Sequence, residues 1–105
     1  MKTPVDKRLE LQVILEELLG MKHVYFQPPA SLKMKYPAIV YSRNDIDGVN
    51  ANNSSYLQWD GYKVTVIDED PDSEYVHKVA QLPKCSFSQH YSVDNLNHDV
   101  FTLYY

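Results

Sequence analysis

The densest group of side chains that could do chemistry is an acidic cluster in the second half of the chain: Asp68, Glu69, Asp70, Asp72 and Glu74. Carboxylates at a strand end are the ligands that a hard cation or a two-metal nuclease centre requires. No lysine follows at a spacing that would complete a nuclease site. Asp70 can instead cap a helix whose first turn holds Asp72 and Glu74. We therefore predict a turn at Asp68, Asp70 and Asp72 without a metal, and keep a small metal-dependent hydrolase or nuclease using residues 68–74 as an alternative.

The histidines and the cysteine carry no recognisable catalytic or metal-binding spacing. Cys85 is the only cysteine, so it cannot form an internal disulfide, and a nucleophile would need a positioned base beside it. The three glycines do not form a phosphate-binding loop. We predict no catalytic residue, no metal and no cofactor. The four histidines fall in four different predicted elements, without HxH, HxxxH or HExxH spacing: His23, His77, His90 and His98.

Length and composition predict one domain over residues 1–105. Ten basic against fourteen acidic residues, a net charge of −4, disfavour sequence-specific nucleic-acid binding. No apolar run approaches the ~20 residues of a membrane span, and the N-terminus lacks the pattern of a signal peptide. The nine tyrosines suggest additional contact surface, because tyrosine covers apolar area and keeps one polar end.

Two helices and five strands would position these side chains. A first helix is predicted over residues 4–19, between Thr3-Pro4 and Gly20. A second is predicted over residues 71–81, with Asp70 as its N-cap. The predicted strands cover residues 23–26, 36–43, 62–67, 85–91 and 98–105. The order α-β-β-β-α-β-β favours an α+β fold, a mainly antiparallel sheet with both helices packed on one face.

Hydrophobic periodicity predicts the core of this fold. Apolar residues recur at helical spacing in the two helices and at every second position in the strands. In the last hairpin, Cys85, Phe87, Gln89 and Tyr91 are predicted to share one face. The predicted core consists of Leu11, Ile14, Leu15, Leu18, Ile39, Val64, Val66, Val76, Val79 and Phe87.

A long polar segment between two predicted strands is the strongest candidate for contacts with a partner. Residues 44–58 are rich in asparagine, and a connection of this length is typical of functional loops. Aromatic and apolar residues follow it at once, so we predict a long hairpin loop that projects from the body and carries contacts. The candidate interface residues are Asn44, Asp45, Asp47, Asn50, Asn52, Asn53, Tyr56, Leu57 and Trp59.

The order of these elements, with four segments, resembles the small tail-completion proteins of long-tailed bacteriophages, including the tail terminator or tail-to-head joining proteins. The segments are LEELLG at the end of the first helix, YPAIVYSR before the polar loop, YKVTVIDEDPDSE leading into the second helix, and NHDVFTLYY at the C-terminus. The likeness covers nearly the whole chain. It consists of packing patterns and contains no catalytic signature.

The resemblance implies a structural, non-enzymatic virion protein that forms a homo-oligomeric ring, usually a hexamer, at the head–tail junction. Its implied partners are the phage tail tube protein and the head connector proteins, and it implies no membrane. Its implied location is the virion, with the host cytoplasm as the place of assembly. Another head–tail connector or neck component remains an alternative that the sequence does not separate from a tail terminator.

Overall fold

A computed structural model describes residues 4–44 and 60–105 of the chain, and within them the predicted element order α-β-β-β-α-β-β is confirmed. All seven elements lie close to their expected positions in the sequence. They are α1 (Pro4–Leu19), β1 (Val24–Phe26), β2 (Ala38–Arg43), β3 (Gly61–Asp68), α3 (Glu74–Ala80), β4 (Cys85–Val93) and β5 (Leu96–Tyr104).

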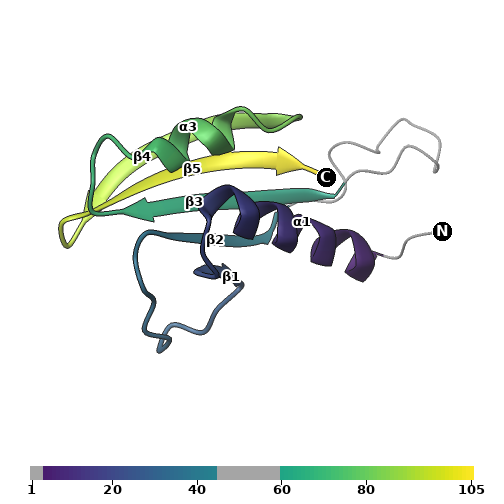
Figure 1. The fold of residues 1–105 in the computed structure, drawn as a ribbon, viewed down its shortest axis with the longest axis horizontal. Helices are drawn as coiled ribbons and strands as arrows, with labels where there is room; N and C mark the ends of the chain where they lie inside the picture. Colours follow the sequence, from purple (N-terminus) through teal and green to yellow (C-terminus); the bar gives the residue numbers. More distant parts are fainter. Residues whose placement is uncertain (1–3, 45–59) are drawn as a thin grey trace.

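The strands form one sheet in the order β1-β2-β3-β5-β4 (Figure 1). Only β1 and β2 run parallel, and the other three pairs are antiparallel, so the predicted α+β fold with a mainly antiparallel sheet is confirmed. The C-terminal strand β5 inserts between β3 and β4. This insertion makes β5 a central strand and leaves β4 at one edge, with the short β1 at the other.

The turn between β4 and β5 explains the register of the terminal hairpin. Val93 pairs with Leu96, so the loop has only two residues, Asp94 and Asn95. Both have positive φ, 54° and 64°, which is the backbone of a type I′ turn. Aspartate and asparagine tolerate this conformation better than other non-glycine residues, and its twist matches that of the strands.

Helix α1 places one apolar face on the sheet. Leu11, Leu15 and Leu19 are buried, one helical turn apart, while Ile14 and Leu18 lie half-buried beside them. Gly20 ends the helix as predicted: its φ is +76°, and its N–H donates to the Glu16 carbonyl at 2.8 Å.

The core lies between α1 and the strand faces that meet it. Side chains alternate along each strand, so every second residue of β2, β3 and β5 points to this side. Burial of Leu11, Leu15, Ile39, Val64, Val66 and Val79 confirms six of the predicted core positions. Val76 is half-buried at the margin. The prediction missed several large members: Leu19, Tyr41, Tyr62, Phe101 and Leu103.

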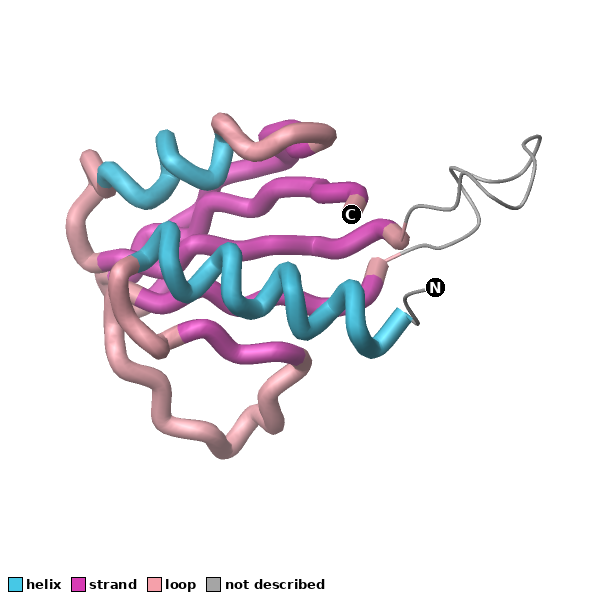
Figure 2. Tube along the Cα trace, turned by 45° about the vertical axis from the view of Figure 1, so that its right-hand side comes forward, coloured by secondary structure: helices cyan, strands magenta, loops and turns pink. Residues whose placement is uncertain are grey.

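The two helices do not share one face as expected. Helix α1 lies along β1 and β2, whereas α3 lies at the other end of the sheet, against β4 and one end of α1 (Figure 2). Val79 is the residue of α3 that is buried in the core. Because β5 separates β3 from β4, the helix between them must reach across to the β4 end of the sheet.

Helix α3 begins three residues later than predicted, because Ser73 and not Asp70 is its N-cap. Ser73 is 4% exposed, and its hydroxyl accepts the backbone N–H of Tyr75 at 3.3 Å. The Asp70 carboxylate accepts the N–H of Asp72 at 2.9 Å, which closes a turn ahead of the helix. Both residues are good caps by type, but only one of them precedes the first hydrogen-bonded turn.

This arrangement predicts a difference between two substitutions. Ser73→Ala should lower the free energy of unfolding by about 0.5–2 kcal/mol, because it removes the acceptor for a helix N–H at a buried site. Asp70→Ala, in an exposed turn where water can replace the carboxylate, should cost less than about 0.5 kcal/mol. Urea denaturation followed by circular dichroism measures both values. A larger loss of stability for Asp70→Ala than for Ser73→Ala would mean that Asp70 is the N-cap, as predicted from the sequence.

Candidate interaction surface

The interface predicted from the sequence falls mainly on residues 45–59, outside the described residues. Only Asn44 among the nine candidates is described. It is exposed at the end of β2, and its backbone N–H donates to the Gly61 carbonyl at 2.8 Å. This hydrogen bond extends the β2–β3 pairing by one step toward the loop. The contact role of Asp45, Asp47, Asn50, Asn52, Asn53, Tyr56, Leu57 and Trp59 stays a prediction.

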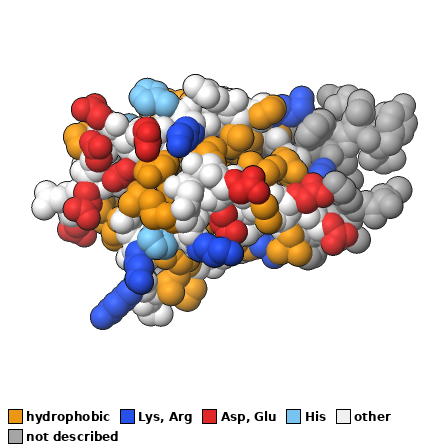
Figure 3. Space-filling view, in the orientation of Figure 1, with side chains coloured by type: hydrophobic (Ala, Val, Ile, Leu, Met, Phe, Trp, Pro, Cys, Tyr) orange, Lys and Arg blue, Asp and Glu red, His pale blue; other side chains and the backbone are white. Residues whose placement is uncertain are grey.

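The acidic residues 68–74 form the turn that leads from β3 into α3. Asp68 accepts the N–H of Asp70 at 3.1 Å, and Asp70 accepts that of Asp72 at 2.9 Å. Two of the carboxylates therefore shape the backbone, as predicted. Glu69, Asp72 and Glu74 are exposed. Figure 3 shows acidic side chains gathered at the end of the molecule where β3 ends.

Within residues 4–44 and 60–105, no three His, Cys, Asp or Glu side chains come together as a metal site would require. Burial raises the pKa of the Cys85 thiol. This shift keeps the side chain further from the thiolate form than an exposed cysteine would be, so the local environment does not activate it as a nucleophile.

Strand β4 is the most exposed regular element of the described structure. It is the last strand of the sheet and pairs with β5 along its length. Every residue from Ser86 to Val93 is exposed, and Cys85 is half-buried. An edge strand presents a row of backbone N–H and C=O groups that can pair with another chain. Proteins commonly protect such edges with lysine or proline, and β4 contains neither.

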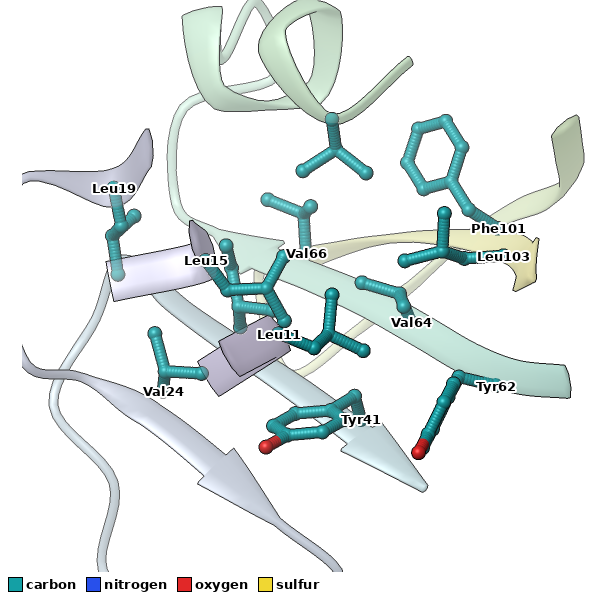
Figure 4. Close-up of a cluster of buried hydrophobic side chains, with 12 residues drawn as sticks. Leu11, Leu15, Leu19, Val24, Tyr41, Tyr62, Val64, Val66, Phe101 and Leu103 are labelled. Carbon is teal, nitrogen blue, oxygen red and sulfur yellow. The ribbon is translucent and has the colours of Figure 1, made fainter. Parts of the chain in front are cut away.

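Three large apolar side chains of β4 are exposed, and one of them corrects the predicted core. Phe87 is 57% exposed, Val93 50% and Tyr91 40%. Phe87 packs edge-on against Phe101, with the ring centroids 5.6 Å apart, but no described element covers its outer side. Phe101 itself points into the core (Figure 4). The alternating pattern was right about the strand and wrong about the burial of Phe87.

A β-bulge explains why the predicted face of β4 is also wrong. Phe87 pairs with Phe101 and Gln89 pairs with Val100. β4 therefore has one residue more than β5 between these two pairs. The extra residue reverses the alternation. Phe87 lies on the side of the core, whereas Gln89 and Tyr91 lie on the opposite side. The exposed aromatic side chains of β4 are therefore divided between both faces of the edge.

Side-chain contacts join both faces of this strand to β5. Tyr91 stacks on His98, with ring centroids 4.7 Å apart and an interplanar angle of 12°. His90 Nδ1 lies 2.8 Å from the Asp99 carboxylate. The strand is thus held along the edge that pairs with β5, and its other backbone edge has no strand beside it in the described sheet.

Asn97 joins the hairpin to the acidic turn. Its side-chain amide donates to the carbonyl oxygens of Asp68 and Glu69, both at 3.3 Å, and its side-chain oxygen accepts the Ser92 hydroxyl at 3.1 Å. This single residue therefore fixes the acidic turn relative to β4. No local sequence pattern indicates its role, because the contact depends on the pairing of Asp68 with Asn97 across the sheet.

An apolar groove of about 310 Å³ lies between α1, the segment after α3 and the C-terminal end of β5. Its walls include Leu11, Ile14, Leu82 and Leu103. Tyr105 closes one side, and its hydroxyl donates to a Glu10 carboxylate oxygen at 2.9 Å. Burial and this hydrogen bond raise the pKa of Tyr105. The groove offers contact area to an apolar group.

Comparison of this chain with protein families, with curated proteins and with solved structures finds no match. None of the helices in the described ranges is both long enough and apolar enough to cross a bilayer. Among the described residues, the fold is α+β and its sheet ends in an exposed, partly apolar edge strand.

Proposed function

We propose that this chain is a structural virion protein of a tailed bacteriophage, a ring-forming tail terminator or tail-completion subunit at the head–tail junction. In this role it works without catalysis, and its copies associate into a closed hexameric ring. The ring binds the tail tube protein on one side and head connector proteins on the other. It assembles in the host cytoplasm and becomes part of the virion.

The exposed β4 edge is the observation that carries this proposal. A strand of nine residues with eight exposed positions and three exposed apolar side chains suits a subunit completed by contacts with other chains. The resemblance of four sequence segments to phage tail-completion proteins is the reason for proposing a ring at the head–tail junction. Its strand–turn–helix portion, residues 62–75, corresponds to β3, the acidic turn and the start of α3.

Another head–tail connector or neck component would use the same surface, so it remains the nearest alternative. The hydrolase alternative has less support. Two of its candidate carboxylates, those of Asp68 and Asp70, accept hydrogen bonds from backbone N–H groups of the turn.

Electron microscopy of the negatively stained, purified chain tests the proposal. We expect closed rings of uniform size, and native mass spectrometry of the same sample gives the number of copies. A chain that remains monomeric at high concentration would contradict a ring-forming role. Cleavage of DNA in the presence of Mn²⁺, lost in Asp70→Ala, would favour the hydrolase instead.

A further inference from the structure

Helix α1 carries apolar side chains on two opposite faces, and the core explains only the inner one. On the outer side, Leu9 is 48% exposed and Val13 is 50% exposed. These residues are four positions apart, so their side chains adjoin and form one apolar ridge. Single exposed apolar residues are common on protein surfaces, but a helix that packs on a core with one face normally has a polar opposite face. None of the described elements covers this ridge.

Carboxylates frame the apolar ridge on both sides. At 3.6 residues per turn, Asp6 and Glu17 fall on one flank of the ridge and Glu16 falls on the other. Asp6 and Glu17 are exposed, and Glu16 is half-buried. In Figure 3, acidic and hydrophobic side chains lie next to one another in the region that α1 occupies in Figure 1. We define the outer face of α1 as Asp6, Leu9, Val13, Glu16, Glu17 and the following Gly20.

The basic residues of α1 lie away from this outer face. The Arg8 guanidinium lies over the Phe26 ring, 4.5 Å from its centroid, and so points toward β1. Lys7 precedes the half-buried Ile14 by seven residues, nearly two full turns, so both lie on the flank that borders the apolar groove. Within the helix, the outer face therefore carries charge of one sign only.

A hollow of about 450 Å³ continues the outer face at the C-terminal end of α1. Gly20 ends the helix with a φ of +76°, a conformation that favours glycine, and a Cβ placed there would meet nothing within 4 Å. The residue that stops the helix thus leaves open space beside the apolar ridge. The lining consists of Val13, Glu16, Glu17, Gly20, Met21 and Lys22.

We propose that the outer face of α1 binds an amphipathic helix of another protein, whose apolar line is flanked by lysine or arginine. Leu9 and Val13 form an i, i+4 ridge that fits the groove between the ridges of a second helix. The carboxylates on both flanks complement basic flanks on the partner. Two outer faces would bring carboxylates together, so a second copy of this chain does not fit by the same face. The proposal goes beyond the ring, because this face does not include the β4 edge.

Two synthetic helical peptides, each about as long as α1, test this proposal on the full chain. Both have one line of leucines, which lysines flank in the first peptide and glutamates flank in the second. Fluorescence anisotropy of the labelled peptides measures the dissociation constants over a salt series. The lysine peptide should bind at least about tenfold more tightly than the glutamate peptide, and added salt should weaken its binding.

Two variants of the outer face should each weaken binding of the lysine peptide about tenfold. Val13→Gln removes apolar area and keeps a good helix former. Glu16→Lys combined with Glu17→Lys reverses the charge on both flanks. Circular dichroism should show that both variants remain folded, since the buried side of α1 is unchanged.

Each variant has a matched control outside the outer face. Val93→Gln changes a valine that is equally exposed, at 50%, in β4. Glu69→Lys combined with Asp72→Lys makes the same change in net charge in the turn after β3, at two exposed positions. Both controls should bind the lysine peptide like the wild type.

Several results would overturn the proposal. They are a wild-type chain that does not bind the lysine peptide, equal binding of the two peptides, and equal weakening in the controls. Loss of self-assembly in the outer-face variants would assign this face to a second copy and would also overturn it. A wild-type chain that binds the lysine peptide selectively but forms no rings would support this contact and contradict the ring-forming function.

Discussion

Phe101→Ala is expected to lower the free energy of unfolding by about 3–5 kcal/mol, the usual cost of removing a buried phenylalanine ring. Phe101 is 1% exposed and belongs to the core cluster that α1 covers. It pairs with Val64 across β3 and β5, so the cavity would open at the centre of the sheet. Denaturant titration followed by near- and far-ultraviolet circular dichroism measures the loss.

Phe87→Ala is the matched control for this substitution. The two rings contact each other, with centroids 5.6 Å apart, but Phe87 is 57% exposed at the sheet edge. Its removal should therefore cost less than about 1 kcal/mol. If β4 lies in an interface, Phe87→Ala should weaken self-association while the monomer keeps its stability. Equal losses of stability for the two substitutions would place Phe87 in the core, as the sequence alone suggested.

The sequence predicted most of the elements because their signals are local. Pro4 and Gly20 mark the ends of α1, and the alternation of Tyr62, Val64 and Val66 marks β3. The same signals fail where two nearby residues are both suited to be the N-cap of one helix. Asp70 and Ser73 are both good N-caps, and hydrogen bonding in the folded turn, which no local pattern encodes, decides between them.

The exposure of β4 could not be predicted from the sequence, for a different reason. Alternation separates the two faces of a strand but does not say whether another element covers either face. The bulge after Phe87 then reverses the alternation, and the insertion of β5 beside β3 decides that β4 becomes an edge. Both features depend on pairing between residues distant in the chain.

The candidate surface divides in the same way. The lysines of residues 22–35 and the carboxylates of residues 68–74 are visible in the sequence as separate groups. The strand register places both groups at the same end of the sheet, because Ala38 pairs with Ile67 and Asp68 with Asn97. The sequence therefore supplies the charges, and the pairing of distant strands determines which of them lie near one another.

Two buried tyrosines of neighbouring strands provide the second large expected effect. Tyr41 and Tyr62 are both 0% exposed, with ring centroids 6.0 Å apart. The Tyr41 hydroxyl donates to the side-chain oxygen of Gln12 at 2.5 Å, and the Gln12 amide donates in turn to the Val24 carbonyl at 3.0 Å. Burial raises the pKa of Tyr41, so its hydroxyl stays protonated as this donor. These contacts link α1 to β1 and β2.

Tyr41→Phe should consequently lower the free energy of unfolding by about 1–3 kcal/mol, because the Gln12 oxygen loses its donor in a partly buried site. Tyr62→Phe should behave differently. The Tyr62 hydroxyl is buried and has no hydrogen-bond partner in the described structure. Removing a buried polar group that lacks a partner should leave stability unchanged or raise it by up to about 1 kcal/mol.

Urea titrations of the two phenylalanine variants at one protein concentration compare these costs directly. The substitutions remove the same atom from side chains of the same type and burial, so the difference between them reports the polar contacts of the Tyr41 hydroxyl, with Gln12 and with the neighbouring Arg8. A loss at Tyr62 equal to that at Tyr41 would mean that the Tyr62 hydroxyl has a partner in solution. Repeating the titration on the assembled protein would then show whether association supplies that partner, because only an interface contact makes the cost depend on assembly.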